Sequence, residues 1–504
     1  MFRLIVVLIL WFFPISIVIG GTIPTGKPDT DIVYTNLREI YLRGLFNNPV
    51  GMFRPLDYRD LDLDTIASKY EPIVTPVKSL IAPYKLENGE LHLRGSLLPH
   101  GLYNDDDQHT YIAASLMMNY RISDNWLVET SYFIDGGLVD DSLYAGKKWD
   151  NFAGYADMAV IGYRGSKLNM DIGRRRNAWG VARSGHSLML SSVSMTMDGL
   201  FLDYTFNRYF SFHSISARLS SLAQDAPYTN SGLTENRYFS AHALRISPLN
   251  WWDIVLKESV VYGGVGRDPE LAYVFPLIWY HAEQLNSNID DNTFFGLETV
   301  VRYRNRYAAY LELLLDDYQI ENETESDKEP AEYGLIIGAD IFDWPLEFGA
   351  FEAEYTKIKN YTYNQMKPRN VYINQNYPIG HPLGPDHGSL RLSYTYHINR
   401  QLTAALEGYL INNGQGYLNA NWDTPWIDDP DYHEKFPSGV VEKTRGGRLD
   451  IIFVKNEWLS GKMSFDVADI QNDGNVRDVD RTIWDIELQM ILNLPGISWR
   501  DKDD

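Results

Sequence analysis

Residues 388–397 read Gly388-Ser389-Leu390-Arg391-Leu392-Ser393-Tyr394-Thr395-Tyr396-His397, and a two-residue link, Asn399-Arg400, leads from there into a second segment of the same kind at 401–412. Apolar and polar residues alternate with a period of two, which is typical of a β-strand whose two faces meet different surroundings. One face is predicted to hold Leu390, Leu392, Tyr394 and Tyr396. The other face is predicted to hold Ser389, Arg391, Ser393, Thr395 and His397.

The same pattern recurs from about Glu90 onward in segments of roughly ten residues, and the links between them alternate between short and long. The short links lie at 123–124, 165, 207–208, 248–250, 305–306, 399–400 and 455–456. The long links include 137–151, 175–196, 264–292, 360–386 and 413–446. Short turns at one end and long loops at the other indicate a transmembrane β-barrel, which must be closed because lipid cannot satisfy an open sheet edge. A soluble β-sandwich or propeller would share the alternation but would not require this order of connections.

We therefore predict an all-β fold: a transmembrane antiparallel β-barrel of about 18 strands over residues 89–494, with both termini and the short turns on the periplasmic side. Residues 22–88 differ from the barrel and are predicted to form a small periplasmic helical or plug element; a flexible linker is the alternative. A helix is expected from Thr30-Asp31 to Arg43, with Gly44 ending it. Pro495 is expected to end the last strand and leave 495–504 as a C-terminal tail.

The composition fits an exported membrane barrel. The chain has 504 residues, a net charge of −22, 13 Trp and 34 Tyr, and no cysteine, so disulfides and thiolate metal sites are excluded. The mean hydropathy of −0.30 agrees with strands that turn every second residue to a polar lumen. Residues 1–21 read as a signal peptide for export to the outer membrane, with an uncleaved inner-membrane anchor as the alternative.

A cationic cluster after the strand at 168–172 is the densest candidate site. It contains Arg174, Arg175, Arg176, Trp179, Arg183 and His186. Guanidinium groups can bind carboxylates or phosphates bidentately, and an indole ring offers a face to a sugar. The alternative is that these arginines pair with acidic residues inside the barrel.

The chain resembles the capsule assembly Wzi family at these residues. The similarity lies in Gly173-Arg174-Arg175, Trp179-Gly180 and Ser187-Leu188-Met189-Leu190-Ser191, and further in Leu42-Arg43-Gly44-Leu45, Arg54-Pro55-Leu56 and the block 269–284 with Asp291-Asn292. Val181 departs from the proline or glycine expected after Trp179-Gly180. The resemblance implies an 18-stranded outer-membrane barrel with a periplasmic helical element, acting as a lectin that anchors capsular or other exopolysaccharide at the cell surface.

The long loops carry aromatic residues beside Asn, Asp and Arg, a composition that suits carbohydrate. We predict that Trp279, Tyr280, Trp422 and Trp426 contribute to glycan binding; packing of the loops, or a position at the lipid interface, is the alternative for each. The expected partners are surface polysaccharide, outer-membrane lipid and lipopolysaccharide, and not nucleic acid. A porin for sugars or small anions is the competing function.

Other chemistry is weakly supported. Asp469 to Asp480 has the spacing of a calcium loop, although a tight hairpin loop at Asp473-Gly474 explains it as well. The acidic runs 105–107 and 428–431 are expected to be solvated or to hold cations that bridge lipopolysaccharide. The sequence offers no nucleophile elbow and no acid/base pair, so we predict neither an enzyme nor a cofactor.

Overall fold

The computed structural model describes residues 21–24, 28–45, 52–104, 108–223, 234–288, 290–317, 329–418, 420, 422–429 and 432–500. The expected signal peptide, apart from Gly21, lies outside these residues, as do the acidic run 105–107 and Asp431. None of the helices in the described part of the chain has the length and apolar character needed to cross a bilayer.

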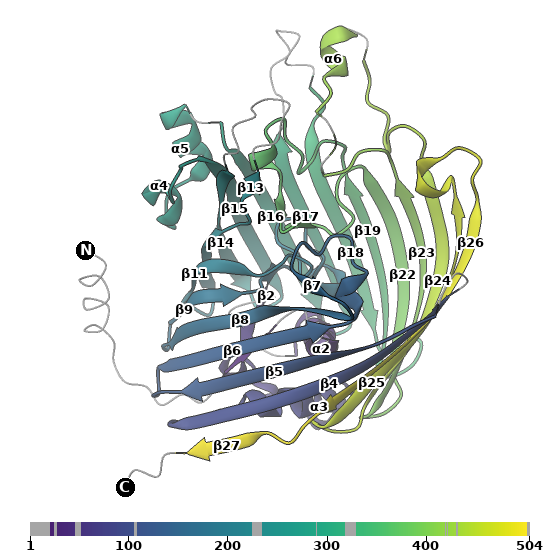
Figure 1. Ribbon diagram of the computed structural model, residues 1–504. Helices are drawn as coiled ribbons and strands as arrows, with labels where there is room; N and C mark the ends of the chain where they lie inside the picture. The colour runs from purple at the N-terminus through teal and green to yellow at the C-terminus, as the bar shows by residue number, and fades with distance from the viewer. Residues whose placement is uncertain are drawn as a thin grey trace.

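A closed antiparallel barrel dominates the molecule (Figure 1), and 18 long strands form its wall, as predicted. The first nine are β4 (Glu90–Asn104), β5 (Gln108–Arg121), β6 (Trp126–Asp135), β8 (Phe152–Arg164), β9 (Leu168–Arg175), β11 (Met197–Asn207), β12 (Phe210–Arg218), β14 (Thr234–Leu249) and β15 (Trp252–Val265). The other nine are β16 (Asn292–Tyr303), β17 (Tyr307–Asp317), β18 (Glu332–Phe342), β19 (Gly349–Ile358), β22 (His387–His397), β23 (Leu402–Asn413), β24 (Glu442–Val454), β25 (Leu459–Gln471) and β26 (Arg481–Asn493). The barrel closes where β26 pairs with β4.

The two faces of the strands follow the predicted alternation. On β22, Leu390 and Leu392 are exposed on the outer wall, whereas His397 is buried and its Nε2 lies 2.8 Å from Oε2 of Glu39 in the lumen. On β26, Leu488 is exposed outside and Glu487 faces inward, 3.0 Å from His100 Nε2. On these two strands every second residue therefore faces lipid, and the charged residues between them face inward.

Exposed aromatic side chains gather at the end of the barrel that has the short turns. They are Phe206, Phe210, Trp251, Tyr303, Tyr307, Trp344 and Trp458. Aromatic rings favour the boundary between hydrocarbon and water, and barrels carry such girdles at their interfaces. This row therefore marks the periplasmic boundary of the membrane and places the long loops on the extracellular side.

The N-terminal element lies inside the barrel as a plug. Its helices are α2 (Pro28–Leu42) and α3 (Glu71–Ile81), and short pairs join β1 (Thr22–Ile23) to β3 (Leu56–Asp57) and β2 (Phe53–Arg54) to β10 (Ala178–Trp179). The helix predicted to run from Thr30-Asp31 to Arg43 runs from Pro28 to Leu42, and Gly44 has φ of +67°, which suits the predicted stop. The helix α3 was not predicted. Both helices pack against buried residues of the barrel wall and of the inward-folded loops in one apolar core.

Polar contacts tie the plug to strands around the ring. Arg38 donates to Glu352 on β19 (2.6 Å) and Tyr41 donates to Asp253 on β15 (2.6 Å). The backbone N–H of Thr22 donates to Glu129 on β6 (2.9 Å). A flexible linker is therefore the wrong interpretation of this segment.

The C-terminal tail corrects another prediction. Pro495 does end β26, but β27 (Ile497–Arg500) follows and pairs with the first part of β4, Ile497 opposite Leu93 and Arg500 opposite Glu90. The remaining short elements are β7 (Lys148–Trp149), β13 (Leu222–Ala223), β20 (Ile373–Asn374), β21 (Tyr377–Pro378), α4 (Leu271–Val274), α5 (Tyr280–Ser287) and α6 (Pro425–Asp428).

Candidate functional site

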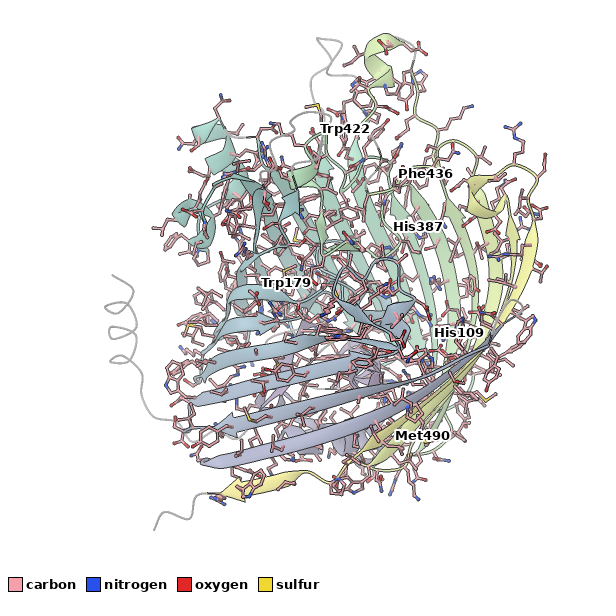
Figure 2. All side chains as sticks on the ribbon, viewed as in Figure 1. His109, Trp179, His387, Trp422, Phe436 and Met490 are labelled. Atoms are coloured by element: carbon pink, nitrogen blue, oxygen red, sulfur yellow. The ribbon has the colours of Figure 1, made fainter. Side chains whose placement is uncertain are left out.

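The loop 176–196 folds into the lumen and joins the plug to the wall. Trp179 pairs with Phe53 across β10 and β2, and its ring packs edge-on against Phe53 at 5.4 Å. It is 2% exposed, and Figure 2 shows it deep within the barrel. Leu188, Met189 and Leu190 are fully buried. Neither face of Trp179 is open to a sugar, so its predicted stacking role is wrong; it packs the core.

Beneath this loop, a buried ammonium bridges two carboxylates. Nζ of Lys257 donates to Glu298 (3.0 Å), to Glu312 (2.9 Å) and to the carbonyl of Trp179 (3.2 Å). Glu312 also accepts hydrogen bonds from the hydroxyl of Ser187 (3.0 Å) and the N–H of Leu188 (3.2 Å). This network fixes the inward fold of the loop.

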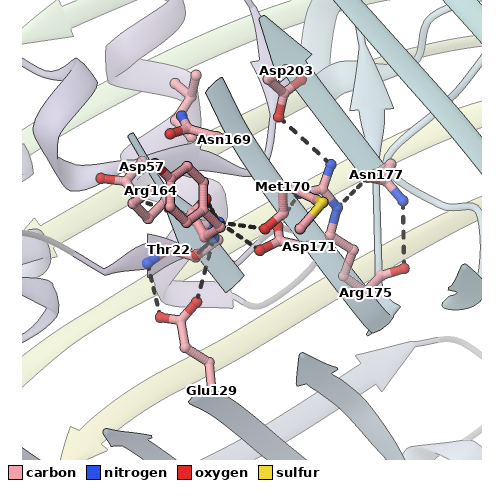
Figure 3. Close-up of polar contacts among 12 residues, drawn as sticks. Thr22, Asp57, Glu129, Arg164, Asn169, Met170, Asp171, Arg175, Asn177 and Asp203 are labelled. Atoms are coloured by element: carbon pink, nitrogen blue, oxygen red, sulfur yellow. Dashed lines mark hydrogen bonds and ion pairs between the residues drawn. The ribbon is translucent and has the colours of Figure 1, made fainter. Parts of the chain in front are cut away.

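Arg175 of the cluster is committed to an inward-facing acid, as the alternative interpretation held. Arg175 is buried, pairs with Asp171, donates to Asn177 (2.8 Å) and stacks over Phe201 at 4.3 Å. Figure 3 shows that Asp171 also accepts from Arg164, which donates to Asp57 of the plug (2.9 Å). The spacing could have indicated this, because Asp171 and Arg175 are four residues apart and so share one face of β9.

Two further arginines of the cluster, Arg174 and Arg183, point in different directions. Arg174 has the opposite parity and forms a bidentate pair with Asp198 on the outer wall (2.6 Å for both contacts), so it cannot contribute to a lumenal site. Arg183 lies in the lumen, where it pairs with Glu407 (2.5 Å) and lies 3.8 Å from Glu352. The six residues of the cluster therefore do not form a single surface.

Three extracellular loops and the plug enclose a cavity of 620 Å³ in the lumen. The loops are 136–151, 176–196 and 359–386, and the plug contributes residues of α2 and β2. The polar lining residues are Asp31, Thr35, Arg54, Asp141, Tyr155, Arg176, Ser184, His186, Ser192, Tyr377 and Lys462. Of the predicted cluster, only Arg176 and His186 reach this cavity.

Arg54 is a buried cation of the cavity lining, and like Arg176 it has an Nε without a hydrogen-bond partner among the described residues. It is 3% exposed and its guanidinium lies over the ring of Tyr34 at 4.6 Å. Burial lowers the pKa of Arg54, yet a guanidinium remains charged at neutral pH. Sequence reasoning missed Arg54 as a site residue, although it lies in Arg54-Pro55-Leu56, one of the stretches in which the sequence resembles the family.

His186 is held uncharged beside this cation. Burial, together with repulsion from the nearby Arg391, Arg54 and Arg183, lowers its pKa to about 4. A neutral imidazole has one donor and one acceptor nitrogen, which suits sugar hydroxyls. Arg176 contributes a second cation, with its Nε 3.6 Å from Asp157 and its guanidinium 5.8 Å from the ring of Tyr155.

The predicted loop aromatics lie apart from the cavity. Trp422 and the buried Trp426 pack edge-on against Tyr361, at 5.1 Å and 5.4 Å, and Figure 2 shows Trp422 high in the extracellular loops. Tyr280 is fully buried and Trp279 is 70% exposed, both in the loop after β15. Tyr280 and Trp426 therefore match the packing alternative; Trp422 and Trp279 keep open surface.

The acidic loop between β25 and β26 follows the hairpin interpretation. Asn472 donates its N–H to Asp480 (3.1 Å), and Asp469 accepts from Thr482 (2.7 Å). Asp473 pairs with Arg481 at 3.2 Å, and Gly474 has φ of +62° in the turn. These carboxylates point to protein partners rather than to a common centre.

The closed ring of strands, the lipid-facing outer wall and the aromatic girdle define the class of outer-membrane β-barrels, here with a plugged lumen and a cavity under the extracellular loops. The family profile described as "Capsule assembly protein Wzi" matches residues 88–482, which is well over half of the chain. The chain belongs to the capsule assembly protein Wzi family, and the predictions of this family and of a non-enzymatic barrel are confirmed. No curated protein sequence matches the chain significantly.

Three solved structures are similar to the chain. Wzi of Escherichia coli, described as an outer membrane protein involved in group 1 capsule assembly and as a carbohydrate-binding β-barrel, is 14% identical; the match covers 94% of this chain and 99% of that chain, with a TM-score of 0.62. OccD3 (OpdP) of Pseudomonas aeruginosa is 10% identical over 80% of this chain and 91% of that chain, with a TM-score of 0.48. OprD of Pseudomonas aeruginosa is 12% identical over 81% and 95%, with a TM-score of 0.46. At 14% identity the Escherichia coli structure supports the fold alone, and the other two, with TM-scores below 0.5, carry no argument.

Proposed function

We propose that this chain is a carbohydrate-binding outer-membrane barrel of capsule assembly, which holds surface polysaccharide at its extracellular mouth. The observation that carries the proposal is the 620 Å³ cavity, whose walls come from three extracellular loops and whose lining includes a buried arginine with an unbonded Nε. Family membership supports the same activity, as does the carbohydrate binding ascribed to the Escherichia coli protein. Capsular or exopolysaccharide is the proposed partner.

The cavity favours an acidic sugar unit. Arg54, Arg176 and Lys462 bring positive charge, and a carboxylate could accept the free Nε–H of Arg54. His186 and Tyr377 supply groups that hydrogen-bond hydroxyls. Asp31 and Asp141 lie on the same lining and would accept hydrogen bonds from other hydroxyls of the bound sugar.

Replacing Arg54 with methionine is expected to weaken binding of the capsular polysaccharide purified from the producing strain. A hydrogen bond to a charged group is worth about 1.5–3 kcal/mol, which corresponds to roughly a tenfold to hundredfold loss of affinity. Methionine keeps apolar contact with Tyr34. The measurement is titration calorimetry on the barrel in detergent, and high salt should reduce the difference between the two proteins.

The matched control is Lys455→Gln, which removes a cation from a periplasmic turn and should bind normally. Wild-type affinity of a correctly folded Arg54→Met protein would place the sugar elsewhere, with the half-buried Trp422 and the extracellular loops around it as the next region to test.

The competing porin function predicts conduction. The plug contacts wall strands from β6 through β22, and the inward-folded loops share its core, which supports a closed lumen. We expect reconstituted protein to give no stable ohmic steps in planar bilayers under conditions in which an open general porin does. Reproducible steps at the same protein density would favour diffusion of solutes through the lumen.

A further inference from the structure

The described part of the loop after β15, residues 266–288 and 290–291, lies on the outside of the barrel. Figure 1 shows α4 and α5 outside the ring of strands, beside β14 and β15. The outward-facing Val260 and Tyr262 of β15 are buried, although residues of this parity face lipid elsewhere. Tyr273 packs on Tyr262 at 4.6 Å, and Tyr280 packs on His242 of β14 at 4.6 Å. This loop, called the cover below, therefore shields this part of the outer wall from lipid.

Specific polar contacts hold the cover in place. Glu258 faces outward on β15; it accepts the N–H of His281 (2.9 Å) and lies 3.1 Å from Nε2 of His242. At the other end, Tyr273 donates to Asp291 (2.9 Å), and Arg267 pairs with the same carboxylate. Without the cover, the Glu258 carboxylate would face hydrocarbon, which is costly. The cover is thus a fixed part of the wall.

The opposite side of the cover is apolar and exposed. Its large side chains are between 52% and 83% exposed, and they are Leu271, Phe275, Leu277, Trp279 and Leu285. A cluster of this kind usually marks a binding surface for protein or membrane. Polar residues follow at the end of α5, where Asn286 and Ser287 are exposed.

The height of the cover in the membrane follows from strand length. A transmembrane β-strand crosses the hydrocarbon in about 9–11 residues. The strand β15 begins at Trp252, next to Trp251 of the periplasmic girdle, so Glu258 and Val260 are only six and eight positions along it. The wall under the cover is therefore still at hydrocarbon depth. Below it the lipid-facing surface continues directly with the exposed Leu256.

We propose that the cover, residues 266–291, is seated in the outer leaflet, with its apolar side chains against the acyl chains of the membrane lipid. Its occupant is lipid rather than sugar, so Trp279 contacts the membrane and does not belong to the glycan site. The surface is continuous with the lipid-facing wall of the barrel, and the polar end of α5 reaches toward the headgroups. This inference is independent of the proposed polysaccharide binding.

The test uses the absence of cysteine in the chain. A single Leu277→Cys variant is spin-labelled and reconstituted in phosphatidylcholine vesicles, and its collision rates with oxygen and with a water-soluble nickel chelate are measured. Leu392→Cys on the outer wall serves as the lipid reference, and Val476→Cys on the extracellular loop between β25 and β26 serves as the water reference. We expect the oxygen-to-nickel ratio at position 277 to match that at 392 and to exceed that at 476 severalfold.

A ratio equal to that at position 476 would overturn the proposal, because the cover would then stand in water. Low collision rates with both reagents would overturn it as well, since they would show that protein, such as a second copy of the chain, covers the surface. Leu285→Cys probes the same face and replaces Leu277→Cys if the latter fails to insert.

Discussion

Lys257→Met is expected to destabilise the barrel by about 3–5 kcal/mol, because breaking a buried ion pair from one side leaves uncompensated charge. The side chain of Lys257 is fully shielded from solvent, and its partners Glu298 and Glu312 are buried. Methionine has similar length but cannot donate a hydrogen bond, so two carboxylates are left facing each other in the plugged lumen. The loss would also release the inward-folded loop, since the same ammonium binds the carbonyl of Trp179.

The measurement is urea unfolding of the protein in lipid vesicles, followed by the mobility of the folded band on gels. The double variant Lys257→Met/Glu298→Gln is the control, because it removes one of the two uncompensated charges and should recover part of the loss. Equal stability of wild type and the single variant would mean that the carboxylates are protonated or hydrated, and that the triad does not hold the plug.

Leu392→Arg is expected to cost about 2–4 kcal/mol, the range for a cation on the lipid face near the middle of a bilayer. Leu392 is exposed on the outer wall near the middle of β22. The residue paired with it on the neighbouring strand β19 faces the same side of the sheet. The same unfolding assay measures the change.

Leu392→Met is its matched control, since it keeps an apolar side chain of similar volume in contact with lipid and should be nearly neutral. If arginine and methionine proved equally harmless, position 392 would not face hydrocarbon, and the assignment of the outer wall would fail.

The architecture of the wall could be predicted because its causes are local. Lipid on one side and a polar interior on the other impose a period of two on each strand, and Leu392 or Glu487 can be assigned from its neighbours alone. The order of short and long links follows from the same constraint. The short strand β27 escaped prediction because Pro495 breaks one pairing without preventing the next.

The filling of the lumen could not be predicted from local pattern. Alternation places Ser393 in a wide polar lumen, where a large residue would be tolerated, yet Ser393 is 3% exposed because the interior is packed. The contacts that fill it join distant residues, such as Glu39 with His397. The arginine cluster failed as a single site for the same reason: the charges are visible in sequence, but their partners Asp157 and Asp203 come from other strands.

The double pairing of β4 has a consequence for how the molecule can be assembled. Its later part pairs with β26, Leu494 then donates its N–H to Gly95 (2.9 Å), and β27 pairs with the earlier part. One edge of β4, the first strand of the wall, is thus hydrogen-bonded only by the last residues of the sheet, which lie some four hundred positions away in sequence. Until the seam closes, β4 therefore presents an open edge, which the insertion machinery or another strand must shield.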